Sequence, residues 1–207
     1  MTTFCEGSGS FLFFFNNNLL RNSLNFDVGI YEIMTAEHIS KKKRFQEKGL
    51  TIGTKAPIIE TNDIYGNGVS LNDLLRENDF ILIDFYRGAW WKPCKKHLKK
   101  IRDNIEQFNK WHVKVIIIST DSIQHTIAMA EEHNFKFTMI SDRGAKIAKT
   151  YNVYTYGSML DRSFMKTKMA VPSDFLIDRS EKIVWRYIGA RKDRPTLEIL
   201  TNAIDEQ

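Results

Sequence analysis

Two nearly continuous apolar runs dominate the hydrophobic pattern. They are Phe80–Tyr86 (FILIDFY) and Val113–Ser119 (VKVIIIS), and runs of this kind are typical of strands buried on both faces, as in a parallel sheet. The segment between them, from about Pro93 to Trp111, has apolar residues at spacings of three and four, which predicts one long helix. These apolar residues are Cys94, Leu98, Ile101, Ile105 and Phe108.

Shorter elements complete the pattern. Ser70 is a candidate N-cap for one helix, and Asp121 or Ser122 for another. The further predicted helices are Leu71–Arg76, Ile123 to about His133, Ala145–Tyr151 and one that starts at Pro195; the further strands are Thr138–Ser141 and the hairpin of Phe175–Asp178 with Ile183–Ile188. This order predicts an α/β fold, with a central mixed β-sheet covered by helices on both faces.

The first 45 residues differ from the rest. They combine a Gly/Ser segment, an Asn run and a basic cluster, with no sustained period of 3.6 or 2. We therefore expect residues 1–45 to be a disordered or irregular N-terminal extension, and residues 46–207 to form one domain.

The chain carries 30 Lys and Arg against 25 Asp and Glu, a net charge of +5. One basic stretch, Lys92–Arg102, lies on the predicted helix mainly away from its apolar face, so we interpret it as a solvated surface rather than a nucleic-acid stripe. No apolar run reaches the length of a membrane span, and the Phe11–Phe15 patch is too short for a signal peptide. We expect a cytoplasmic protein with neither nucleic acid nor membrane among its partners.

Two cysteines, Cys5 and Cys94, exclude a disulfide scaffold and an all-cysteine zinc site. The five histidines show no metal-binding spacing, and no phosphate-binding or dinucleotide fingerprint occurs. We therefore expect no metal and no cofactor. Chemistry that needs one thiol remains open.

A predicted strand runs into the predicted helix through the segment ILIDFYRGAWWKPCKKHL, residues 81–98. Its end resembles the thioredoxin active-site turn, Trp-Cys-Gly-Pro-Cys-Lys. The whole segment resembles even better the peroxiredoxin-like AhpC/TSA family, which commonly reads Phe-Tyr-Arg-Gly-x-Trp-Cys-Pro-x-Cys. Both alignments place Trp91 at the first cysteine position and Cys94 at the second.

The resemblance extends over roughly residues 48–200. Its marks are Gly53 to Pro57, Asp63 to Leu75, Ser119 to Asp121, Ser141 to Tyr151, and Val171 to Asp178. It implies a thioredoxin-like fold, in which Pro172 would be a cis-proline facing the Cys94 loop. It also implies a peroxide or disulfide substrate, an external thiol reductant and a possible homodimer.

The departure from the family pattern falls on the chemistry. In both families the first cysteine attacks the substrate from a helix N-terminus, which stabilises a thiolate, and the indole of Trp91 cannot do this. Cys94 would keep part of the helix effect and has basic neighbours, yet it also lies on the apolar face, where burial raises a thiol pKa. An inert, half-buried cysteine is the alternative interpretation. A register that makes Cys94 the attacking residue directly fits less well, because it requires Pro at Arg87 and Thr or Ser at Trp91.

Asp84 and Arg87 are the other candidate catalytic residues. Asp84 interrupts an apolar strand, and thioredoxins have a buried Asp there that relays a proton beneath the second cysteine; an Asp at a sheet edge or paired with Lys is the alternative. Arg87 matches the family's Arg after Phe-Tyr and could polarise a peroxide or anion, or it could form a surface ion pair. Many peroxiredoxins place a further Arg before the later strand, and the nearest substitutes here are Arg162 and Lys168.

Two hypotheses follow. The first is a peroxiredoxin-like thiol oxidoreductase with Cys94 as the redox thiol, Asp84 and Arg87 in support, and Trp90, Trp91 and Pro172 as substrate-binding residues. The second is a non-catalytic thioredoxin-fold module, in which Trp90 and Trp91 anchor a protein partner. For Trp90 by itself, a packing role is the favoured interpretation. A solvent-reachable Cys94 Sγ at a helix N-terminus would favour the first hypothesis, and a fully buried one the second.

Overall fold

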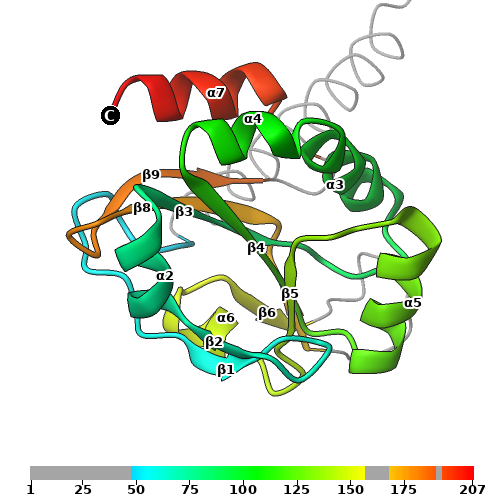
Figure 1. Ribbon diagram of the computed structural model, residues 1–207. Coiled ribbons are helices and arrows are strands. Elements are labelled where there is room, and N and C mark those ends of the chain that lie inside the picture. Colours follow the sequence, from blue (N-terminus) through cyan, green and yellow to red (C-terminus); the bar gives the residue numbers. More distant parts are fainter. Residues whose placement is uncertain (1–47, 157–167, 190–192) are drawn as a thin grey trace, which may run out of the picture. The chain divides into compact units, whose positions relative to one another are not determined.

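The computed structural model describes residues 48–156, 168–189 and 193–207 (Figure 1). The proposed N-terminal extension and Arg162 lie outside these residues, so the division of the chain at residue 45 stays a prediction. Among the helices within these ranges, none is both long and apolar enough to cross a bilayer.

A five-stranded mixed sheet in the order β5-β4-β3-β8-β9 forms the centre of the fold. β3 pairs in parallel with β4 and β4 with β5, whereas β8 is antiparallel to both β3 and β9. The strands are β3 (Phe80–Phe85), β4 (Val113–Ser119), β5 (Thr138–Ser141), β8 (Ser173–Asp178) and β9 (Ile183–Ile188). The predicted mixed sheet and its strands are confirmed, and β3, which carries Asp84, is the central strand.

Helices cover both faces of this sheet (Figure 1). One apolar cluster joins the sheet to α2 and α6, and a second joins its other face to α3, α4, α5 and α7. The helices are α2 (Leu71–Glu77), α3 (Lys92–Asp103), α4 (Ile105–Lys110), α5 (Ile123–His133), α6 (Lys146–Thr150) and α7 (Leu197–Asp205). The α/β, thioredoxin-like arrangement predicted from the sequence is therefore confirmed.

The single helix predicted between Pro93 and Trp111 is wrong in one respect. It is broken at Asn104, whose backbone (φ −120°, ψ 16°) is not helical and separates α3 from α4. The Asn104 side-chain amide donates to the carbonyl of Lys100 (2.8 Å). Asparagine competes for backbone groups in this way and so tends to end helices. The apolar face continues across the break, because Ile101 and Phe108 join the same cluster.

Two short hairpins lie outside the main sheet. β1 (Glu60–Asn62) pairs antiparallel with β2 (Gly68–Ser70), and Asp63 fixes the turn between them by accepting from the backbone of Tyr65 and Asn67. β6 (Tyr154–Tyr156) pairs antiparallel with β7 (Lys168–Ala170). The sequence did not predict the second hairpin, because three-residue strands carry almost no periodic signal.

The helix starts follow the predicted capping chemistry. Ser70 accepts from the backbone of Asp73, and Ser122 from that of His125. The last helix begins at Leu197 with Thr196 as its N-cap, so the predicted start at Pro195 is two residues early. Thr196 supplies an oxygen for a free backbone amide, which Pro195 cannot do.

Candidate functional site

Two carboxylates face each other across the centre of the sheet. Asp84 on β3 and Asp174 on β8 are register partners in the antiparallel pair, so their side chains emerge on the same face. Both side chains are fully buried. Like charges directly opposite each other destabilise a sheet, and this pair therefore requires positive charge from elsewhere in the fold.

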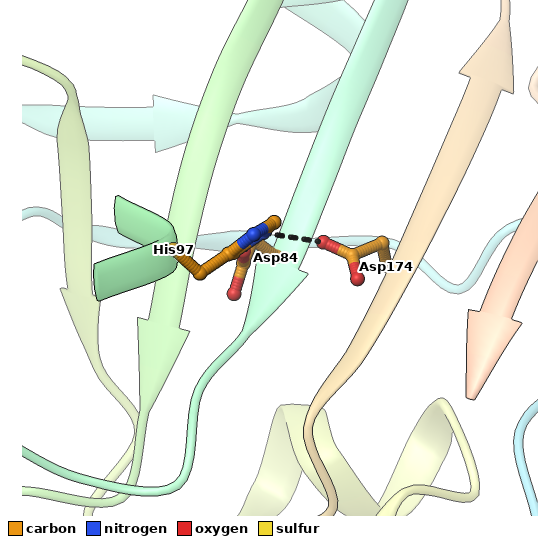
Figure 2. A group of neighbouring side chains, drawn as sticks. All are labelled: Asp84, His97 and Asp174. Carbon is orange, nitrogen blue, oxygen red and sulfur yellow. Dashed lines mark ion pairs between the residues drawn. The ribbon is translucent and has the colours of Figure 1, made fainter. Parts of the chain in front are cut away.

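Two cationic side chains supply that charge, Arg194 from the segment before α7 and His97 from α3. Arg194 Nη2 donates to Asp84 Oδ2 and lies 3.3 Å from Asp174 Oδ1, while its Nη1 donates to the carbonyl of Phe85. His97 Nε2 lies 2.9 Å from Asp84 Oδ2 and 3.6 Å from Asp174 Oδ1 (Figure 2). We call Asp84, His97, Asp174 and Arg194 the buried quartet.

The protonation states within the buried quartet follow from these contacts. Burial alone would raise the pKa of Asp84, but the charges of Arg194 and His97 outweigh it and lower the pKa to about 2. Burial prevails at Asp174, whose pKa is raised in spite of Arg194. For His97, burial and Arg194 act to lower the pKa, yet both carboxylates favour the imidazolium and the pKa is raised. Arg194 and the favoured imidazolium of His97 thus offset the negative charge of the carboxylate pair.

Three members of the buried quartet have the chemistry of metal ligands, since ligand atoms of Asp84, His97 and Asp174 lie within 4.8 Å of one another. The guanidinium of Arg194 contacts both carboxylates of this set. A divalent ion added to two carboxylates, Arg194 and a neutral His97 would leave a net positive charge in the core, which burial disfavours. The residues present therefore fit a proton on His97 better than a metal ion.

Cys94 lies in the first turn of α3, three residues before His97. Its side chain is 0% exposed and packs in the apolar cluster that also contains Leu98 and Tyr86. Burial raises the pKa of the Cys94 thiol to about 11, although the charge of Arg194 and a hydrogen bond from the Arg87 backbone act to lower it. The thiol is consequently neutral and covered in this conformation.

The loop of residues 87–91 joins β3 to α3. Its backbone turns at Gly88, where φ is +154° and an added Cβ would come within 2.5 Å of the Trp90 Nε1 atom. The Ala89 amide donates to the carboxylate of Asp121 at 2.6 Å, and the Trp91 amide donates to the Gly88 carbonyl. Burial raises the pKa of Asp121, which the bond from Ala89 partly offsets. The loop is thus held in place by one acidic side chain from the neighbouring strand–helix junction.

Arg87 lies over both tryptophans of this loop, with its guanidinium carbon 5.6 Å from the Trp90 ring centre and 5.1 Å from that of Trp91. Such cation–π contacts contribute about 0.5–1 kcal/mol each at exposed sites. Trp90 is 51% exposed, whereas Trp91 packs partly against the Cys94 cluster as the N-cap residue of α3. The two indoles lie edge to face, 5.5 Å apart.

The sequence predicted a cis bond before Pro172, and this is wrong: the described residues contain no cis peptide bond. Pro172 is buried immediately before β8, and its carbonyl accepts from the backbone amide of Gly189 at 2.8 Å. Lys168, one of the two substitutes considered for a later arginine, is exposed on β7. The alternatives for Asp84, a sheet edge or a lysine partner, are both wrong, because Asp84 lies on the central strand against Arg194 and His97.

Sequence reasoning counted His97 among the basic neighbours of Cys94 that favour a thiolate, but it did not place His97 beside Asp84, and it missed Asp174 and Arg194. Asp174 offered one signal, since it precedes an apolar strand as Asp84 interrupts another. His97 follows Cys94 by three residues and so shares its helix face. Arg194 gave no signal, because only the fold brings a residue from the segment before α7 to the centre of the sheet.

A mixed sheet with helices on both faces, and a cysteine in the first turn of the helix that follows its central strand, define a thioredoxin-like domain. Within this class, the AhpC/TSA family model matches residues 52–186, and the chain belongs to this family.

Similar proteins include redox proteins. The peroxiredoxin Bcp of Bacillus subtilis is 29% identical over 145 residues, 69% of this chain and 88% of that protein. The thiol-disulfide oxidoreductase ResA of Bacillus cereus is 27% identical over 141 residues, 68% of this chain and 71% of that protein.

Solved structures confirm the fold. The peroxidoxin BcpB from Mycobacterium tuberculosis superposes with a TM-score of 0.63 at 22% identity, covering 75% of this chain and 95% of that one. A cysteine mutant of the peroxiredoxin 6 of Arenicola marina superposes with a TM-score of 0.67 at 16% identity, covering 76% and 73%.

Proposed function

We propose that the protein is a peroxiredoxin-like thiol oxidoreductase in which Cys94 is the redox thiol and the substrate is a peroxide or a protein disulfide. The observation that carries the proposal is the buried quartet next to Cys94. Burying four ionisable side chains is expensive in free energy, and a passive apolar core has no need of them. Groups with shifted pKa values beside a potential nucleophile are typical of functional sites.

The reaction requires the loop of residues 87–91 to open. Burial is the largest cause of the high Cys94 pKa, so an opening that wets Sγ removes that cause and exposes the thiol in one step. The charge of Arg194 then favours the thiolate. Asp84 would accept the thiol proton transiently, because Arg194 and His97 hold it as the carboxylate. Arg87 would stabilise the bound anion, and Trp90, Trp91 and Pro172 would contact the substrate.

The proposed chemistry balances with an external thiol. The Cys94 thiolate attacks the peroxide, the O–O bond breaks, and sulfenate and an alcohol or water form. A reducing thiol attacks the sulfenate sulfur and releases water, and a second thiol frees Cys94 as a disulfide forms. No further cofactor is required. We also propose that the protein is located in the cytoplasm and forms a homodimer.

Trp91 is part of this proposal, because it stands where the family pattern has its attacking cysteine. The replacement would make a single-cysteine enzyme, dependent on an external thiol. Converting Trp91→Cys should therefore raise peroxidase activity if the rest of the site is competent.

The test uses Cys5→Ser protein, so that only Cys94 can react. After hydrogen peroxide treatment, a sulfenate-specific dione probe and intact mass measurement should reveal one adduct, absent from the matched Cys94→Ser control. The rate of Cys94 alkylation is then measured across pH, in this protein and in the same protein carrying Asp84→Asn. We expect the rate to rise as the pH rises, because the thiol ionises in states where the loop has opened. A Cys94 that neither alkylates nor forms sulfenate while the protein is folded would overturn the proposal.

The complete burial of Cys94 favours a second function, a non-catalytic thioredoxin-fold module that binds a protein partner. In that case the half-exposed Trp90, stacked by Arg87, would be the anchor. The same experiment separates the two functions: an inert Cys94 supports the binding module, and sulfenate formation contradicts it.

A further inference from the structure

The buried quartet has an electrostatic consequence for Cys94, an inference that rests on the proposed function. Asp84 and Asp174 are fixed opposite each other by the strand register. Arg194 and His97 come from two different elements, and their side chains are 6% and 4% exposed. The cations thus meet the carboxylates where solvent cannot screen the charges.

Cys94 is close enough to feel this balance. It precedes His97 by one helical turn on the buried side of α3, and it senses the charges of Arg194, Asp84 and Asp174. Arg194 and the imidazolium of His97 offset the negative charge of Asp84 and Asp174, which they contact directly. Loss of either cation makes the surroundings of the thiol more negative by one charge, which opposes formation of a thiolate.

We propose that Arg194 and His97 are positioning residues, which together neutralise the paired carboxylates and thereby determine how readily Cys94 ionises. Neither residue needs to touch the substrate. Two tyrosines also lie near this group, Tyr86 in the Cys94 cluster and Tyr187 on β9. Burial raises the pKa of both, that of Tyr187 to about 12, so their hydroxyls stay neutral and add no charge. Asp193, which interacts with Tyr187, is exposed to solvent, which screens its charge.

The first experiment is independent of thiol reactivity. We expect the ¹⁵N resonances of the His97 ring to report a doubly protonated imidazole at pH 7, and a neutral one after Asp84→Asn. His133 is the internal control, because burial lowers its pKa and its ring should be neutral in both proteins. A neutral His97 in the unmodified protein would overturn the charge balance on which the inference stands.

The second experiment measures alkylation of Cys94 by iodoacetamide at pH 8.5 in Cys5→Ser protein. Arg194→Met and His97→Gln should each slow alkylation about tenfold, which corresponds to a thiol pKa higher by about one unit. Arg194→Lys, which keeps the charge, should react at nearly the parent rate. Unchanged rates in both neutral variants would overturn the inference.

Adding Asp84→Asn to either neutral variant separates charge from access. Removing one carboxylate restores the charge balance, so the rate should return to within about threefold of the parent, whereas a rate lowered by altered packing would stay low. These double variants also bury no unpaired charge, which keeps the test valid if Arg194→Met folds poorly. If Cys94 never alkylates, the proposed function fails, and the His97 resonances still decide the charge balance.

Discussion

In the proposed mechanism, the residues that hold the loop of residues 87–91 control access to the Cys94 thiol. The Arg87 backbone donates to the sulfur, and the Ala89 amide is bound by Asp121. A buried thiol reacts only in states where its cover has opened, so the free energy of opening enters directly into the rate. We expect the hydrogen bond between the Ala89 amide and Asp121 to contribute more to this free energy of opening than any other single contact.

Removing this contact should accelerate the reaction of Cys94. A hydrogen bond to a charged group contributes about 1.5–3 kcal/mol, so we expect Asp121→Ala to raise the iodoacetamide rate constant at least tenfold in Cys5→Ser protein. Asp103→Ala, which removes an exposed carboxylate at the end of α3, is the matched control and should leave the rate unchanged. Equal rates in the two variants would mean that Asp121 does not hold the loop.

Pairing of whole elements creates the buried quartet. β3 and β8 place their acids opposite each other, α3 brings a histidine over that face, and the segment before α7 brings an arginine. This quartet links β3, β8, α3 and the segment before α7 through charge, in addition to the apolar contacts among these elements. Breaking such a buried link is far more costly than breaking an ion pair on the surface.

The difference in stability between a buried and an exposed ion pair can be measured by substituting one arginine of each kind. Arg194→Met leaves Asp84 and Asp174 buried with one cation fewer, and we expect a loss of about 3–5 kcal/mol in the free energy of unfolding by urea. Arg76→Met breaks the exposed pair with Asp73 on α2 and should change it by less than about 1 kcal/mol. A similar small loss in both variants would contradict the structural importance of Arg194.

The same residues link the stability of the whole domain to pH. The pKa of His97 is raised above the unfolded value of 6.5. Its contribution is therefore fully present below pH 6.5 and is lost as the pH rises through the folded pKa. Asp84 has the opposite pH dependence, because its pKa is lowered to about 2 in the folded protein. Its contribution to stability is fully present above pH 3.8 and is lost as the pH falls through 2.

Comparison with His97→Gln isolates the histidine. The unfolding free energy of the unmodified protein should exceed that of the variant most near pH 6, and the difference should shrink as the pH rises to 9. Urea titrations at three pH values suffice. A difference that stays constant or grows with pH would show that His97 is buried as the neutral imidazole.

The sequence determined the elements and the family. Apolar runs mark β3 and β4, spacings of three and four mark the buried face of α3, and the segment from Phe85 to Cys94 gives the fold through its likeness to a known turn. These are local properties, set by the period of a strand or helix and by residues adjacent in the chain. Asn104 shows where such local patterns fail. The apolar spacing predicts a helix that continues through this position, but the Asn104 side chain binds a backbone carbonyl and the helix ends there.

Only the tertiary structure decided what surrounds Cys94. Asp84 lies 90 residues before Asp174 and 110 before Arg194 in the chain, and no periodic pattern connects positions so far apart. Strand register and the path of the chain into α7 bring them together. Burial, the largest cause of the high thiol pKa, also arises only when the helices close over the sheet. The sequence could name the thiol, but its charge environment and its access to solvent follow from long-range packing.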